Sequence, residues 1–330
     1  MKQFGLLALS TLALLLATPT FGADTLPPVM KKVLISQVVD HPALNETTQG
    51  IIDGLASKGY IIGDNLTLRV ESAQANAALA TQIASKFIHQ QPDVVVGVGT
   101  PSAQSFAKAA ADHKVRLIFS SVTDPLSAGL VQSLEAPGYD ISGVSNFVPL
   151  TPQLKYFLDI QPNLNQLGII YNPGEINSVA IVKQLEALCP PLNITLVKQT
   201  VARTADVPQA AVKLAAQVDA IFISNDNTAL SSLQSIIKAA QAQAIPVYVS
   251  DTGAVSLGAI AALGPNQYDI GLQTGRMIAR VLEGDQLSTM PVEFPEKTEL
   301  YLNVEAADAI GLTIPEILLD AASSIVGSAS

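Results

Sequence analysis

The chain has 330 residues, of which 48% are hydrophobic and only 14% are charged, whereas a typical soluble domain is about 25% charged. Its length is that of about two domains, and its net charge of −10 argues against nucleic acid or an anionic membrane as the main partner, because both require a basic face. The single cysteine, Cys189, excludes an internal disulfide and a cysteine-rich zinc site.

The opening of the chain has the composition of a cleaved secretory signal. Lys2 precedes an apolar run at 4–17, and the small residues Thr20 and Gly22 stand at −3 and −1 relative to Ala23. The run is shorter than the roughly 20 residues of a membrane-spanning helix, which disfavours an uncleaved anchor. No cysteine lies near the cleavage site, so no lipid anchor is expected. We therefore expect a soluble protein exported to the periplasm.

Predicted strands and helices alternate along the rest of the chain. The first series has strands at 33–39, 66–71, 93–98 and 115–119, and helices at 43–58, 76–90 and 102–113. The second series has strands at 166–171, 193–200, 220–223 and 246–249, and helices at 151–160, 176–188, 207–217, 228–242 and 268–282. Runs such as VVVGV and AIFI are apolar on both faces, as in parallel strands covered by helices on each side.

This alternation predicts an α/β fold with two doubly wound parallel-sheet lobes, joined by a hinge and separated by a ligand cleft. The two series are separated around 143–149. The expected division of the chain is a signal peptide at 1–22, an N-terminal lobe at 23–147 plus about 265–290, and a C-terminal lobe at 148–264 plus about 291–330.

Ligands of such sheets bind beyond the carboxyl ends of the strands, so the loops that follow strands are the candidate site. These loops, at 36–44, 99–104, 120–125, 171–178, 224–228 and 250–255, contain no lysine or arginine. Their acidic residues are Asp40, Asp124, Glu175, Asp226 and Asp251. Their neutral groups at helix starts are Thr100, Ser102, Ser121, Thr123, Asn172, Asn177, Ser178, Asn225, Asn227 and Thr228. Acids favour a cation and helix N-termini favour a small anion, which together indicate a zwitterion such as an amino acid.

Other interpretations of these loops stay open. Asp, Asn, Ser and Thr before a helix most often act as N-caps. The run GVGT at 97–100 lacks the third glycine of a dinucleotide loop, because Ser102 stands there. A metal site on Asp40, Asp226 and Asp251 has no ligand spacing in its favour, and we expect neither metal nor cofactor. A hydrolase or racemase that uses His41 and an aspartate is a minor alternative.

Several longer motifs resemble one protein family. They are HPAL (41–44), GTPSAQ (99–104), SVTDPLSAGLV (121–131), GVSN (143–146), IIYNPGEINS (169–178), SNDNTAL (224–230), SLGAIAALGPNQYDIGLQTGRMIARVLEG (256–284) and LTIPEILL (312–319). In this order they resemble the substrate-binding proteins of ABC importers of the tryptophan/tyrosine type. The resemblance implies a type I periplasmic binding protein fold, a monomer, and an ABC permease of the inner membrane as partner.

The resemblance also implies an amino-acid ligand, aromatic or large and apolar, and roles for individual residues. Its carboxylate would contact Thr100, Ser102, Ser121 and Thr123, and its ammonium would contact Asp226 with help from Asn225. Its side chain would be lined by Gln37, His41, Asn146 and Tyr171, and the candidate set is completed by Asn172, Ser178 and Asp251. The alternative within the same fold is a binding protein that reports its ligand to a membrane sensor.

Overall fold

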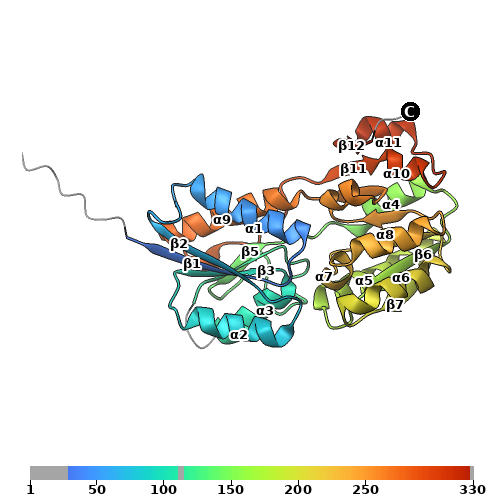
Figure 1. The fold of residues 1–330 in the computed structure, drawn as a ribbon. Coiled ribbons are helices and arrows are strands. Elements are labelled where there is room, and N and C mark those ends of the chain that lie inside the picture. Colours follow the sequence, from blue (N-terminus) through green and yellow to red (C-terminus); the bar gives the residue numbers. More distant parts are fainter. Residues whose placement is uncertain (1–28, 111–114, 328–330) are drawn as a thin grey trace, which may run out of the picture.

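The computed structural model describes residues 29–110 and 115–327, and the predicted signal segment lies outside these ranges. The described residues form two α/β lobes that lie side by side (Figure 1). Within the described ranges, no helix combines the length and the apolar character of a membrane span.

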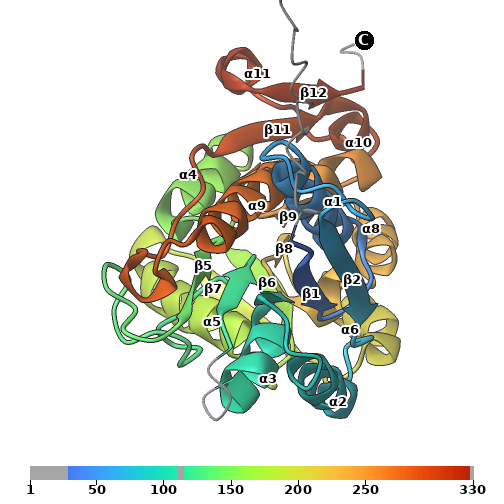
Figure 2. The ribbon, with the colours of Figure 1, turned by 90° about the vertical axis from the view of Figure 1, so that its left-hand side faces the viewer.

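The first lobe is built on a five-stranded parallel sheet with the order β2-β1-β3-β4-β5. Its strands are β1 (Lys31–Gln37), β2 (Leu66–Ser72), β3 (Val94–Val98), β4 (Leu117–Ser120) and β5 (Ile141–Val144). One face is covered by α1 (Pro42–Ala56) and α9 (Gln267–Glu283), and the other by α2 (Ala77–Ile88) and α3 (Thr100–Ala110), as Figure 2 shows. All of β3 is buried, as expected for a strand with helices on both sides.

The second lobe contains a seven-stranded sheet with the order β12-β11-β10-β9-β8-β6-β7. Its strands are β6 (Gln166–Tyr171), β7 (Thr195–Thr200), β8 (Ala220–Ile223), β9 (Val247–Val249), β10 (Ala261–Gly264), β11 (Glu299–Asn303) and β12 (Ser324–Val326). One face packs on α4 (Leu150–Ile160) and α5 (Ile176–Leu188), and the other on α6 (Val207–Ala215) and α8 (Leu233–Gln241). The remaining helices are α7 (Asn227–Leu230), α10 (Val304–Asp308) and α11 (Glu316–Ala321), with short 3-10 turns η1 (Pro190–Leu192), η2 (Thr204–Asp206), η3 (Thr252–Leu257) and η4 (Leu287–Thr289).

The two lobes with largely parallel sheets confirm the predicted fold class, but details differ. Strands β5, β10, β11 and β12 were not among the predicted strands. The helix predicted at 228–242 is broken into α7 and α8. Ser231 Oγ donates to the Asn227 carbonyl at 2.6 Å, and Ser232 leaves the helical region with φ −128° and ψ 23°. Short hydroxyl side chains compete with the main chain for hydrogen bonds in this way. In addition, β10 and β11 pair antiparallel, whereas a wholly parallel sheet was expected.

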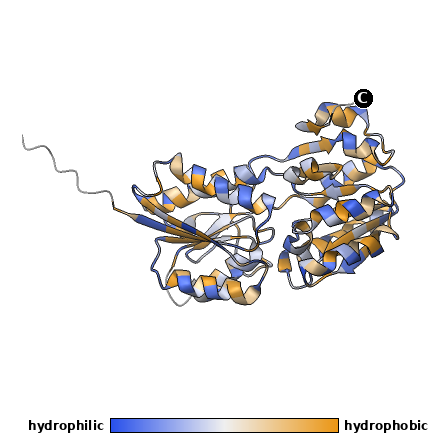
Figure 3. Ribbon diagram, in the orientation of Figure 1, coloured by the Kyte–Doolittle hydropathy of each residue, from blue (hydrophilic) through white to orange (hydrophobic). Residues whose placement is uncertain are grey.

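The cores lie between the sheets and their helices, and the helices show hydrophilic and hydrophobic residues along their length, as amphipathic helices do (Figure 3). Cys189 is fully buried in the core of the second lobe. Burial raises the pKa of its thiol to about 11. It is therefore a packing residue rather than a thiolate nucleophile.

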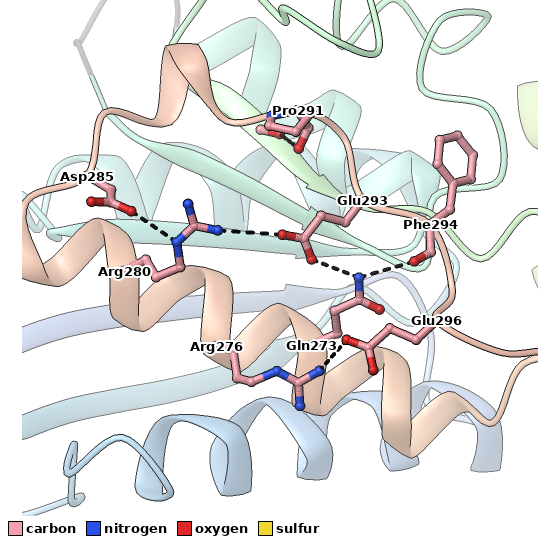
Figure 4. A network of polar contacts seen from close by, with 9 residues as sticks. Gln273, Arg276, Arg280, Asp285, Pro291, Glu293, Phe294 and Glu296 are labelled. Atoms are coloured by element: carbon pink, nitrogen blue, oxygen red, sulfur yellow. Dashed lines mark hydrogen bonds and ion pairs between the residues drawn. The ribbon is translucent and has the colours of Figure 1, made fainter.

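Three segments pass between the lobes: residues 145–149 after β5, 265–266 before α9, and 294–298 before β11. Val144 pairs in parallel with Glu293, so the returning chain extends the first sheet before it crosses. Figure 4 shows this third crossing held against α9, where Gln273 Nε2 donates to Glu293 Oε2 at 2.7 Å and to the Phe294 carbonyl at 3.1 Å. We propose these crossings as the hinge and as the lobe boundaries.

Candidate ligand-binding site

A cavity, here called the interlobe cavity, lies where the carboxyl ends of the two sheets face each other. From the first lobe and the first crossing it is lined by His41, Ala43, Leu44, Thr100, Ser121, Asn146 and Gln267. From the second lobe it is lined by Asn177, Asn225, Asn227, Leu230 and Asp251. No lysine or arginine is among these lining residues. The cavity has a volume of only about 20 Å³, which is too small for an amino acid, so the lobes must move apart for one to be held there.

A second pocket adjoins the interlobe cavity and is here called the side pocket. It shares four residues with the cavity: His41, Ala43, Leu230 and Asp251. Its other lining residues are Pro42, Glu46, Leu233, Gly253, Ser256 and Leu257. Residues of both lobes therefore form both spaces.

The structure brings some of the predicted site residues to the cavity and leaves others behind it. Those that line it are His41, Thr100, Ser121, Asn146, Asn225 and Asp251. Those that do not are Gln37, Ser102, Thr123, Tyr171, Asn172, Ser178 and Asp226.

Gln37 illustrates why a predicted residue can be absent from the lining. Its Nε2 donates to the Val39 carbonyl at 2.8 Å and to Asn45 Oδ1 at 2.7 Å. Its Oε1 accepts from Thr48 Oγ1 at 2.7 Å. The whole amide is therefore used to hold the loop after β1 against α1.

Asp226, which was expected to bind the ammonium, is fully buried at the N-terminus of α7. Its Oδ1 accepts from Ala229 N at 2.7 Å, and its Oδ2 accepts from Asn172 N at 2.7 Å. Burial and the nearby charge of Glu175 raise the pKa of Asp226 to about 7. The carboxyl thus caps a helix and ties the β8 loop to the β6 loop, and this geometry does not support a contact with the ligand.

Asp251 is the acidic residue that does face the cavity. It is buried, and its Oδ1 accepts a single hydrogen bond from Gly253 N at 3.3 Å. Burial, together with the charge of Glu46 on the opposite lobe, raises the pKa of Asp251 to about 7. Both effects disfavour the charged carboxylate, and a cation beside it would relieve them.

Glu175 fixes two asparagines that sequence reasoning noted as helix-start groups but left out of the candidate set. Its carboxylate accepts from Asn227 N at 3.0 Å and from Asn227 Nδ2 at 2.6 Å. Asn177 Nδ2 donates to the Asn225 carbonyl at 2.8 Å, and its Oδ1 is buried without a hydrogen-bond partner. The sequence feature that could have identified these two asparagines is their position at the starts of helices that follow strands. For Gln267 the only such feature is its position next to Asn266, the N-cap of α9.

His41 is 6% exposed, and its Nε2 has no hydrogen-bond partner. Burial lowers the pKa of the ring to about 4, against smaller opposing effects of a hydrogen bond with Asn227 and of the charge of Asp40. Because Asn227 Nδ2 donates to Glu175, the amide oxygen of Asn227 is left to accept from the imidazole. A neutral ring carries one donor and one acceptor nitrogen, so Nε2 is a buried polar atom that a ligand group could satisfy.

Hydroxyls and a helix start also belong to the cavity lining. Helix α3 begins at Thr100, and the first N–H groups of a helix lack partners inside it. Ser121 is a lining residue too, with a left-handed φ of 54°, and its Oγ donates to Gln267 Oε1 at 3.2 Å. The helix start can accept a small anion.

The lobes meet directly at Asn225. Its Nδ2 donates to Thr123 Oγ1 at 3.5 Å and to the Asn146 carbonyl at 3.4 Å. Thr123 therefore contacts the lining without being part of it.

Known proteins resemble this chain over nearly its whole described length. A family model described as ABC transporter substrate binding protein matches residues 32–326. A tyrosine-binding protein of Clostridioides difficile (strain R20291) is 34% identical over 282 residues, which are 86% of this chain and 81% of the relative. The crystal structure of an ABC domain in complex with L-Trp from Streptococcus pneumonia is 30% identical, covers 90% of this chain and 100% of that one, and gives a TM-score of 0.86.

A second solved structure has the same sequence identity to this chain but superposes on it less well. The ligand-free, open structure of a substrate binding protein with adhesive properties from Clostridium difficile is also 30% identical, with coverage of 91% of this chain and 100% of that one, but its TM-score is 0.67. At equal identity, this chain therefore superposes better on the L-Trp complex than on the open, ligand-free structure.

Proposed function

This chain belongs to the ABC transporter substrate-binding protein family, and from that premise we propose that it is a periplasmic protein that delivers an aromatic amino acid to an ABC permease of the inner membrane. Membership gives it the role of a substrate-binding protein in ABC transport. The identity of the ligand, export by a cleaved signal peptide, and the monomeric state are the parts that the proposal adds.

The observation that carries the ligand proposal is that the interlobe cavity is lined by polar groups of two kinds. Asp251 and the unpartnered Asn177 Oδ1 are acceptors. Thr100 and Ser121 carry hydroxyls, and α3 begins at Thr100. An ammonium suits the first group and a carboxylate suits the second. Since no lysine or arginine lines the cavity, a zwitterion fits better than a net anion such as a phosphate ester.

The ligand side chain is proposed to be large and apolar in part. Ala43, Leu44 and Leu230 supply the apolar lining, and the acceptors beside them favour a side chain with an N–H or O–H donor. The tyrosine-binding relative and the L-Trp complex support the same choice. L-tyrosine and L-tryptophan are therefore the first ligands to test.

We propose no enzymatic activity for the site. A hydrolase or racemase would need His41 oriented by an aspartate, but the ring bonds to Asn227. Both carboxylate oxygens of Asp226 already accept hydrogen bonds from main-chain N–H groups.

Calorimetry on protein purified from the periplasm tests the ligand. We expect 1:1 binding of L-tyrosine or L-tryptophan, with much weaker binding of acidic and basic amino acids. The absence of binding by all aromatic amino acids would contradict the ligand proposal. Uptake of the bound amino acid by cells with and without the gene separates import from sensing, because only import predicts a loss of uptake.

N-terminal sequencing tests the compartment. The mature protein is expected to begin near Ala23 and to be released with the periplasmic fraction. Recovery only in washed membranes, with Met1 retained, contradicts soluble export.

A further inference from the structure

The side pocket brings together two carboxyl groups from opposite lobes. Glu46 lies on α1 of the first lobe, and Asp251 is the N-cap residue of η3 in the second lobe; both line the pocket. A β-carbon placed on Gly253 would lie 3.7 Å from Glu46 Oε2 and 3.7 Å from Asp251 Oδ1. The two acidic groups therefore face the same small volume.

The pocket holds no cation of the protein to balance these groups, because none of its described lining residues is a lysine or an arginine. Gly253 N, at 3.3 Å, is a weak donor to Asp251. Burial raises the pKa of Glu46, and burial together with Glu46 raises that of Asp251 to about 7. These shifts agree with negative charge that lacks a partner.

His41 supplies an independent observation in the same place. The side chain is only 6% exposed, lines both the side pocket and the interlobe cavity, and leaves Nε2 without a hydrogen-bond partner. Since a buried polar atom without a partner is rare and costly, a ligand group is expected there. Two carboxylates beside a neutral imidazole suit a group with several N–H donors and a positive charge.

We propose that Glu46 and Asp251 form a cation subsite shared by the two lobes, which receives the ammonium group of the ligand. This inference rests on the proposed function, because it places the ammonium of the same amino acid. It adds Glu46, a first-lobe residue outside the predicted set, as a determinant of specificity.

The subsite also gives the ammonium a part in closure. Closing the lobes brings Glu46 and Asp251 together in a partly dehydrated pocket, where like charges repel more strongly than in water. A ligand without a cation leaves this repulsion in place, whereas an ammonium between the carboxylates replaces it with attraction. The cation therefore selects the closed arrangement as well as adding affinity.

The test pairs one variant with two ligands that differ only in the ammonium: L-tyrosine and 3-(4-hydroxyphenyl)propanoate, or L-tryptophan and indole-3-propanoate if tryptophan binds more tightly. The wild type is expected to bind the propanoate about a hundredfold or more weakly. Glu46→Gln is expected to weaken the amino acid by about three- to tenfold, since Glu46 is exposed and screened. The affinity of this variant for the propanoate should be unchanged or higher than that of the wild type.

Asp53→Asn is the matched control, because it makes the same charge change on the same helix. Asp53 is half-buried, accepts from the Tyr268 hydroxyl at 2.9 Å, and does not line either space. For Asp53→Asn, the ratio of the affinity for the amino acid to the affinity for the propanoate should equal that of the wild type. If Glu46→Gln changes the affinities for both ligands equally, or changes neither affinity, the cation subsite is overturned while the proposed function stands. If the wild type binds no aromatic amino acid, the proposed function fails, and the subsite fails with it.

Discussion

At the scale of single residues, Asp226 and Asp251 separate helix capping from ligand binding. Asp226→Asn keeps an oxygen for the Ala229 N–H, and Asn caps helices about as well as Asp. Its affinity for L-tyrosine is therefore expected to stay within about threefold of the wild type. Asp251→Asn removes the acidic group from the cavity and should weaken binding by about ten- to a hundredfold.

Calorimetry on the two variants, with circular dichroism to check folding, measures this difference. A large loss of affinity in folded Asp226→Asn, with Asp251→Asn unaffected, would show that Asp226 rather than Asp251 binds the ammonium.

The same two carboxyls predict how stability changes with pH. In the folded protein their pKa values are raised to about 7 from an ordinary value of 3.8. Between these values the folded state holds protons that the unfolded state has lost, so stability falls as pH rises towards 7 and is restored as pH decreases. The lowered pKa of His41 acts in the opposite direction, but only between about 4 and 6.5.

The window from pH 8 to 7, above the ordinary pKa of histidine, is therefore governed mainly by the carboxyls. The free energy of unfolding, measured by urea denaturation without ligand, is expected to rise by on the order of 1 kcal/mol as pH is lowered through this window. Asp251→Asn should show a smaller rise. A free energy that decreases over the same window contradicts the raised pKa values.

How far sequence predicts such residues is visible in the segment SNDNT. The sequence placed the segment correctly at the cavity, because it follows the buried strand β8. It did not give the direction of each side chain. Asp226 has an extended main chain, in which successive side chains point to opposite sides. Asn225 and Asn227 thus line the cavity, while Asp226 between them turns inward to cap α7.

At the scale of elements, α1 and α9 pack unusually closely through glycines. A β-carbon on Gly271 would lie 2.1 Å from the Thr47 carbonyl oxygen, and one on Gly50 would lie 2.2 Å from the Tyr268 carbonyl oxygen. Neither helix can admit a methyl group there without moving apart. Because Thr47 and Gln267 at this junction are bonded to each other and to Ser121, the close packing also positions the cavity lining.

Gly271→Ala is therefore expected to lower the free energy of unfolding by about 2–3 kcal/mol or more and to weaken ligand binding. Gly174→Ala is the control, since its added methyl would meet only the Asn172 side chain, at 3.2 Å. Denaturant unfolding of both variants measures the difference. Equal stability of the two would show that the helices separate at little cost.

Elements with a clear apolar run or a clear period were predictable, and length did not decide the outcome. The boundaries of β6, α5 and β8 agree with the predicted ranges, and β8 has only four residues, all apolar. Strands β5 (ISGV) and β10 (AALG) are equally short but include glycine, and β5 also a serine, so they do not stand out as apolar strands. Strand β11 enters its sheet from the other lobe, so its antiparallel direction depends on a crossing that no local pattern records.

At the scale of the whole molecule, the three crossings must bend together when the lobes close. Side chains bond to all three crossings, and the third is held to α9 by the buried Gln273, which donates to both Glu293 and the Phe294 carbonyl (Figure 4). Its neighbour Arg276 also contacts the crossing, through Glu296 at 2.9 Å, but this pair is exposed. Exposed pairs contribute little, so Gln273 is the residue that couples α9 to the hinge.

Small-angle scattering with and without saturating L-tyrosine measures closure. The radius of gyration of the wild type is expected to decrease with ligand. Gln273→Ala removes two hydrogen bonds from the crossing and leaves the Glu293 carboxylate with only Arg280, at 3.8 Å. The variant should therefore close less completely and bind several-fold more weakly, whereas Arg276→Ala should behave as the wild type. If scattering does not change with ligand in the wild type, the lobes do not close around it. If both variants close fully, bending is governed by the other two crossings.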